Sequence, residues 1–173
     1  MQTITVAIAD TNAGRRKKLE QLLGGRPGIK VLGSVMNGSN MAAGSEPAAV
    51  HAIPIEDAVI KVNRLSPRIL FIHLDPSGSE SLTLIEALNR ECPDTFIVVL
   101  TDESVQEERI LQALANGARG YMSHEADSSY FLKAVRVVDD GEIWVPRRML
   151  GLIMDKVCAD ISLWGRGSLD LAS

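Results

Sequence analysis

The sequence predicts an α/β domain in which a parallel sheet is covered by helices on both faces. Short apolar segments of strand length alternate five times with longer segments of helical period. The third apolar segment, Ile69–Leu74, is almost continuously apolar, which is typical of a central parallel strand. Five successive strand–helix units imply parallel strands joined by right-handed crossovers.

Local signals bound each predicted element. The predicted strands are Ile4–Ala9, Ile29–Ser34, Ile69–Leu74, Phe96–Leu100 and Gly120–Met122. The predicted helices are Ala13–Leu23, Ile55–Leu65, Ser81–Cys92, Ser104–Ala115 and Ser129–Val138. Gly24 follows the first helix and Gly141 the fifth, as expected because glycine readily ends a helix. Ser104 and Glu107 have the spacing of a capping box, which predicts the start of the fourth helix.

Two further segments lie outside the five units. Residues 36–54 are rich in Gly, Ser, Asn and Ala, and they predict a flexible insertion. Pro146 can open a C-terminal helix over Arg147–Asp160, whose predicted apolar stripe consists of Leu150, Ile153, Met154 and Val157. This stripe either folds back on the domain or pairs with a second copy, and we expect a homodimer. The chain therefore divides into residues 1–142 and a C-terminal helix and linker at 143–173.

Composition limits the class of protein. The 173 residues are 46% apolar and carry a net charge of −4, which favours one globular core. This mild acidity argues against a nucleic-acid surface spread over the whole chain. Only Cys92 and Cys158 are cysteines, so no disulfide framework is expected. No apolar run approaches the roughly 20 residues that span a bilayer, and we expect a soluble cytoplasmic protein without membrane contact.

Polar residues follow the predicted strands at their carboxyl ends, where parallel sheets bind ligands. They are Asp10, Thr11, His73, Thr101 and His124. Two histidines with one carboxylate can bind a transition metal. The preferred alternative is a disused pocket in which Asp10, His73 and His124 bond to one another and to Thr101.

Several sequence stretches carry a resemblance to a known family. They are Val6–Asp10, Phe96–Thr101, the run Ala113–Tyr121 that includes Ala-Asn-Gly-Ala-Arg-Gly-Tyr, Phe131–Arg136 and Asp140–Trp144. Over about residues 3–160 the chain resembles the receiver domain of two-component response regulators of the LuxR/NarL type. The resemblance implies a (βα)5 receiver-like, or flavodoxin-like, three-layer sandwich with strand order 2-1-3-4-5, plus an extra C-terminal helix.

The family's chemistry is Mg²⁺-assisted phosphoryl transfer to an aspartate, which requires three carboxylates. The resemblance matches Asp10 to the first acid, but it puts Thr11 at the second acid and His73 at the acceptor. It matches Thr101 to the hydroxyl that holds the phosphoryl group, and it puts His124 at the lysine. An imidazole cannot form an acyl phosphate, and one carboxylate with imidazole is a poor Mg²⁺ site. These departures imply a degenerate phosphorylation pocket, no cofactor and no enzymatic activity.

Four alternatives stay open. Asp75, two residues past His73, is a substitute phosphoryl acceptor. The apolar run argues against it, because the run fixes the register of the strand and leaves Asp75 in the following loop. Thr101 with Tyr121 forms either the family's conformational switch or a strand-end hydroxyl beside a half-buried aromatic ring. Trp144 and Arg147 stand where some LuxR-type regulators bind a cyclic dinucleotide; alternatively, Trp144 caps the core. The basic run 15–18 predicts a solvated face, with contact to DNA or an acidic protein as the alternative.

The expected function is that of a signalling and dimerisation module in a LuxR/NarL-type transcription regulator, independent of aspartyl phosphorylation. About a dozen residues follow Asp160, which is too few for a helix-turn-helix domain. The chain is then either a fragment of a longer regulator or a stand-alone adaptor, and we expect DNA contact only through a domain that it does not contain. A partner protein or kinase is the other expected partner.

Overall fold

The computed structural model of the protein describes residues 2–35 and 55–171, with side chains as far as residue 159. The expected flexible insertion over 36–54 lies outside the described residues. None of the described helices is both long enough and apolar enough to span a membrane.

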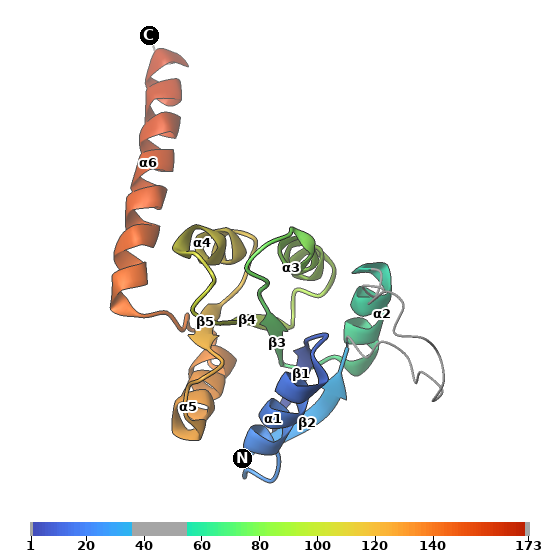
Figure 1. The fold of residues 1–173 in the computed structure, drawn as a ribbon. Coiled ribbons are helices and arrows are strands. Elements are labelled where there is room, and N and C mark those ends of the chain that lie inside the picture. The colour runs from blue at the N-terminus through green and yellow to red at the C-terminus, as the bar shows by residue number, and fades with distance from the viewer. Residues whose placement is uncertain (1, 36–54, 172–173) are drawn as a thin grey trace.

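Five parallel strands form one sheet in the order β2-β1-β3-β4-β5 (Figure 1). They are β1 (Ile4–Ala9), β2 (Ile29–Ser34), β3 (Ile69–His73), β4 (Phe96–Thr101) and β5 (Gly120–Ser123). The strand β3 lies at the centre and pairs in parallel with β1 on one side and β4 on the other. The predicted fold class and strand order are therefore confirmed.

Helices cover both faces of the sheet, as the alternation of side chains along β3 requires. They are α1 (Ala13–Leu23), α2 (Ile55–Leu65), α3 (Glu80–Glu91), α4 (Glu107–Ala115), α5 (Ser128–Asp139) and α6 (Arg147–Leu171). Phe71 of β3 belongs to the core beneath α1 and α5, where it meets Phe131 edge-on. Leu70 and Ile72 belong to the opposite core, beneath α2, α3 and α4.

Two helix boundaries differ from expectation by more than one residue. The helix α4 begins at Glu107 with Gln106 as its N-cap, and no side chain caps it. Ser104 instead bonds Asp102, which accepts hydrogen bonds from both the amide and the hydroxyl of Ser104. The capping-box prediction is therefore wrong, because a local Asx turn uses Ser104. The second difference is that α6 runs to Leu171 and not only to Asp160.

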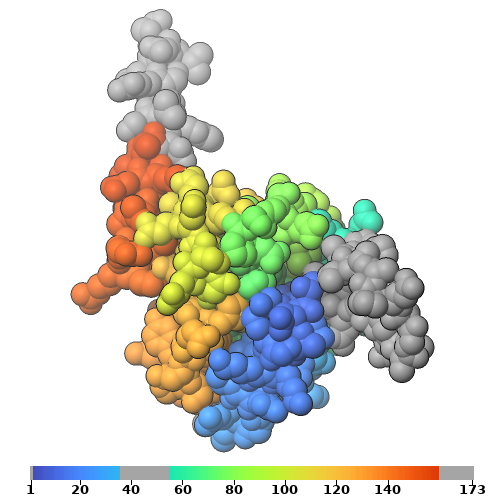
Figure 2. All heavy atoms as spheres, viewed as in Figure 1, coloured from blue at the N-terminus to red at the C-terminus, as the bar shows by residue number. Residues whose placement is uncertain are grey.

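The first turns of α6 pack against the core beside α4. Met149 is fully buried, and Leu152 and Ile153 pack against the same core cluster. Arg148 forms an ion pair with Glu107 of α4, and α6 lies beside α4 in Figure 2. Ile153 therefore folds back on the domain, which is one of the two outcomes predicted for the stripe. Leu150, Met154 and Val157 form the exposed face, with 43%, 58% and 43% of their surface accessible.

Gly120, at the start of β5, provides a test of the packing that closes the domain. A methyl group there would overlap the carbonyl oxygen of Trp144, whose backbone pairs with β5. We expect Gly120→Ala to lower the free energy of unfolding by about 1–3 kcal/mol, the usual cost of overpacking. Urea unfolding followed by circular dichroism measures it.

Gly151 is the matched control for this substitution. It lies in α6, and a methyl group there would meet nothing within 4 Å. Gly151→Ala is therefore expected to raise the free energy of unfolding by at most about 0.5–1 kcal/mol, the gain in helix propensity. Equal unfolding midpoints for the two variants would contradict the proposed overlap.

Candidate functional site

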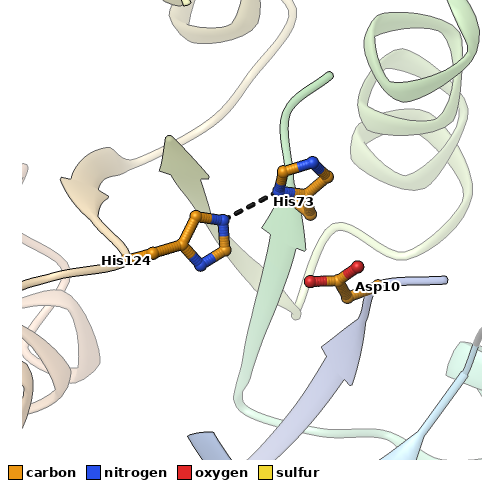
Figure 3. A group of neighbouring side chains, drawn as sticks. All are labelled: Asp10, His73 and His124. Carbon is orange, nitrogen blue, oxygen red and sulfur yellow. Dashed lines mark hydrogen bonds between the residues drawn. The ribbon is translucent and has the colours of Figure 1, made fainter. Parts of the chain in front are cut away.

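Three side chains meet where β1, β3 and β5 reach their carboxyl ends (Figure 3). Asp10 follows β1, His73 is the last residue of β3, and His124 follows β5. The parallel register places these ends at one edge, since Ala9 pairs with Ile72 and His73 pairs with Leu100. One ligand atom from each of the three side chains lies within 4.8 Å of the other two. The predicted convergence of these three residues is confirmed.

The two histidines are hydrogen-bonded to each other. His73 Nδ1 lies 2.8 Å from His124 Nε2, and the ring centroids are 4.9 Å apart. Such a bond needs one N–H and one lone pair, so the two facing nitrogens cannot both carry protons. Burial lowers the pKa of His73 despite the opposing charge of Asp10. Burial, and then the neighbouring His73, lower the pKa of His124 to about 4, so both rings are neutral at pH 7.

Asp10 is a buried carboxylate held by the guanidinium of Arg15. Arg15 Nε donates to Oδ2 at 2.7 Å and Nη2 donates to Oδ1 at 2.8 Å, a bidentate pair. The Asn12 N–H donates to Oδ1 as well. Burial by itself raises the pKa of the Asp10 carboxyl, but these hydrogen bonds outweigh it and hold the pKa below its ordinary value. Asp10 is therefore an ionised and well-compensated group.

The basic run at residues 15–18 divides into two pairs. Arg15 binds the Asp10 carboxylate, and Arg16 donates to the Asp10 carbonyl oxygen at 2.7 Å. Lys17 and Lys18 are exposed. The solvated-face prediction is therefore wrong for the two arginines, because the first turn of α1 lies directly above the end of β1. The available signal was the position of Arg15, one helical turn beyond Asp10.

Asp75 lies in the loop after β3, as the strand phase predicts. Its Oδ1 is 3.4 Å from His73 Nε2, and its Oδ2 accepts a hydrogen bond from Ser81. Arg109 of α4 donates to the carbonyl oxygens of Asp75 and Gly78, at 2.9 and 2.6 Å. Sequence reasoning missed Ser81 of α3 and Arg109 of α4, because no local pattern shows that these two helical side chains point at this loop. The Asp75 acceptor stays a prediction.

The remaining residues of the predicted pocket are less closely joined to it. Thr101 is buried, and its hydroxyl donates to the Met122 carbonyl oxygen at 3.5 Å. The expected bond from Thr101 to a histidine is replaced by this contact with the neighbouring strand. Thr11 is exposed. Tyr121 packs half-buried beneath α4, where burial raises its pKa, and its switch role stays a prediction.

Trp144 is engaged in packing. Its ring meets Tyr130 edge-on at 5.0 Å, and it packs against the core beneath α1 and α5. Its backbone N–H donates to the Arg119 carbonyl oxygen, and its own carbonyl oxygen accepts from Tyr121. Arg147 is exposed at the start of α6. Cyclic dinucleotide binding by Trp144 and Arg147 stays a prediction.

The residues at this edge do not fit the Mg²⁺ ion that the resemblance implies. Mg²⁺ needs hard oxygen ligands in near-octahedral geometry. The three side chains that meet there offer the Asp10 carboxylate, which already binds Arg15, and two imidazoles. The Asp75 carboxylate lies at His73 Nε2, the nitrogen that does not face His124. Arg15 thus supplies the positive charge that a metal ion would otherwise bring to Asp10.

The depressed pKa of His124 predicts a pH dependence of stability. The unfolded chain binds more protons than the folded chain between His124's ordinary pKa of 6.5 and its folded value of about 4. Stability is therefore fully present above pH 6.5 and falls as the pH drops through this window. Urea unfolding at a series of pH values measures it.

A matched pair of variants tests this assignment. His124→Gln is expected to flatten the decline, because the ring that resists protonation is gone. His51→Gln, at the chain's third histidine, is expected to keep it. An unchanged pH profile in His124→Gln would contradict the assignment.

Known proteins with similar sequences include two response-regulator relatives named NreC. No model of a known protein family matches the chain. The oxygen regulatory protein NreC of Staphylococcus haemolyticus is 27% identical over 145 residues, which are 83% of this chain and 58% of that protein. NreC of Staphylococcus carnosus is 32% identical over 94 residues, 54% of this chain and 43% of that protein. The chain thus spans about half the length of the relatives it matches.

Solved structures share the fold. A two-component response regulator of the LuxR family from Aurantimonas sp. SI85-9A1 superposes with a TM-score of 0.66 at 17% identity, over 91% of this chain and 99% of that one. The receiver domain of RcsB from Salmonella enterica serovar Typhimurium, with phosphomimetic BeF3−, gives 0.64 at 17% identity over 88% and 99%. RcsB in two dimers bound to two parallel DNAs gives 0.64 at 18% identity over 88% and 68%. These matches confirm the resemblance in fold.

Proposed function

We propose that this chain, a receiver domain of the LuxR/NarL response-regulator type, signals without aspartyl phosphorylation. Its role is that of a non-enzymatic, cytoplasmic module that dimerises within a transcription regulator. The observation that carries the proposal is the last residue of β3, where the imidazole of His73 bonds His124 at 2.8 Å.

The chemistry of the pocket supports this proposal at three positions. The imidazole of His73, at the acceptor position, offers no carboxylate for an acyl phosphate. Asp10 is a single carboxylate already paired with Arg15, and one carboxylate beside two imidazoles is a poor Mg²⁺ site. His124 is neutral at pH 7, because its pKa is about 4, and it lacks the positive charge that holds phosphoryl oxygens.

Titration with Mg²⁺ and beryllofluoride, followed by amide NMR shifts, tests this proposal. We expect no saturable shifts around Asp10, His73 and Thr101 in the unmodified chain. Saturable, Mg²⁺-dependent shifts that spread to Tyr121 would overturn the proposal. If Asp75→Asn then abolished those shifts, the acceptor would be Asp75.

A reversion variant is the positive control for this titration. Thr11→Asp, His73→Asp and His124→Lys together restore three carboxylates and one ammonium group at the family's positions. The variant is expected to gain saturable shifts with Mg²⁺ and beryllofluoride, because the hard oxygen ligands are then present. Its response shows that the assay detects a working pocket on this scaffold.

We further propose that the exposed face of α6 pairs with a second copy of the chain. Leu150, Met154 and Val157 repeat at intervals of four and three residues, which is the spacing of a coiled-coil seam. Met149 and Ile153 hold the other face of α6 against the core, so the helix is presented in a defined orientation. RcsB binds DNA as dimers. By analogy, a further domain of the full-length regulator would bind DNA. A partner protein or kinase would supply the input signal.

Substitutions on α6 test the dimer. Met154→Glu is expected to raise the dimer dissociation constant more than about tenfold, because it puts a charge into an apolar interface. Analytical ultracentrifugation measures the constant. Asp155→Ala, at the adjacent exposed position, is the control and is expected to leave it unchanged. A monomeric parent chain, or equal constants for the two variants, would overturn the proposed interface.

A further inference from the structure

We propose that His73, His124 and Asp10 bind a first-row transition metal ion, with Zn²⁺ as the best fit, and that Asp75 positions His73 for it. The inference rests on the proposed function, since it names a signal for a receiver domain without phosphoryl chemistry. Figure 3 shows the three proposed ligands as neighbours, with the two imidazoles facing each other and the Asp10 carboxylate beside them.

The donor set selects this class of metal. Two imidazoles with one carboxylate suit Zn²⁺ and neighbouring ions, whereas Mg²⁺ prefers oxygen ligands alone. The three ligands lie at the carboxyl ends of three different strands, so the sheet holds them in place. Asp10 and His73 are buried, with 4% and 8% of their surfaces accessible, which limits competition by solvent.

The distances are close to those of a bound ion. Zn–N bonds of about 2.0–2.1 Å in a tetrahedral site put two ligand nitrogens about 3.3 Å apart. His73 Nδ1 and His124 Nε2 are 2.8 Å apart, so a small rotation of either ring makes room for the ion. In that arrangement the ion replaces the proton that the two nitrogens share.

The surroundings of His73 supply an independent observation. A histidine bound to a metal commonly donates its other ring N–H to a carboxylate, which fixes the ring and its tautomer. Asp75 Oδ1 lies 3.4 Å from His73 Nε2, the nitrogen that faces away from His124. Ser81 and Arg109 hold Asp75 and its loop through the contacts described above. The chain thus places a carboxylate beside the outer nitrogen of His73, where such a partner is found in metal sites.

Charge and access also favour a cation here. The carboxylates of Asp10, Asp75 and Asp102 each attract a positive charge at His73, and the guanidinium of Arg15 opposes them. Asp10 Oδ1 accepts hydrogen bonds from Arg15 and Asn12, whereas Oδ2 accepts one from Arg15, which leaves a second lone pair on Oδ2 for the metal. A cavity of about 240 Å³, with Asp102 and His124 in its wall, adjoins the site. Three protein ligands leave the fourth tetrahedral position open.

Titrations of the chelator-treated chain test the site. We expect one Zn²⁺ per chain by isothermal titration calorimetry, and Co²⁺ to give the intense visible bands of a tetrahedral site. His73→Gln and His124→Gln are each expected to weaken binding at least about 100-fold, since even an outer partner contributes 10–100-fold. Asp75→Asn is expected to weaken it by about 10–100-fold. His51→Gln, the matched control, is expected to retain the full affinity.

A second measurement does not depend on how the variants fold. Two-bond ¹H–¹⁵N spectra of the unmodified chain report each imidazole nitrogen separately. Zn²⁺ is expected to shift His73 Nδ1 and His124 Nε2 while His73 Nε2 keeps its proton. A rise in melting temperature with Zn²⁺ is also expected, because the ion binds only the folded chain.

Three results would overturn the metal site: no stoichiometric Zn²⁺ binding, equal loss of affinity in His51→Gln, or shifts at other imidazole nitrogens. None of these results bears on phosphorylation, which the beryllofluoride titration tests separately. A chain that binds neither Zn²⁺ nor beryllofluoride leaves the proposed function standing and removes only the metal site.

Discussion

The burial of β3 on both of its faces is the constraint on which the rest of the structure depends. All five residues of the strand are buried, and the side chains alternate between the two cores. A slip of one residue would move each apolar side chain to the opposite core and change every contact at the strand end. The strand phase therefore fixes His73 at the sheet edge and leaves Asp75 in the loop.

The polar edge of the sheet is a problem of charge compensation. A buried carboxylate is costly unless a hydrogen-bonded partner matches it, and Arg15 meets this requirement for Asp10 inside the chain itself. The two neutral histidines, His73 and His124, meet their hydrogen-bonding needs by bonding to each other. The polar groups of the pocket are thus paired without a bound ligand. In the proposed metal site, the ion would replace the proton between His73 and His124, and the Asp75 carboxylate would hold His73 in place.

Much of the site followed from the order of strands and helices. Parallel strands end at one edge, so Asp10, His73 and His124 were predictable neighbours once the strands were assigned. Arg15, Ser81 and Arg109 were not predicted as parts of the site, because their roles depend on where a side chain points after folding. The capping box at Ser104 failed for a related reason: the same residue fits two local hydrogen-bonding patterns, and Asp102 decided between them.

By itself, the sequence determined the strand–helix order, the phase of β3 and the residue types at each strand end, since hydrophobic periodicity is a local property of the chain. Only the tertiary structure decided which polar groups pair, because His73 and His124 are 51 residues apart and meet through the order of strands β3, β4 and β5. It also decided which face of α6 is covered. Ile153 packs inward and Met154 remains exposed, because the approach of α6 to α4 sets the orientation of the helix.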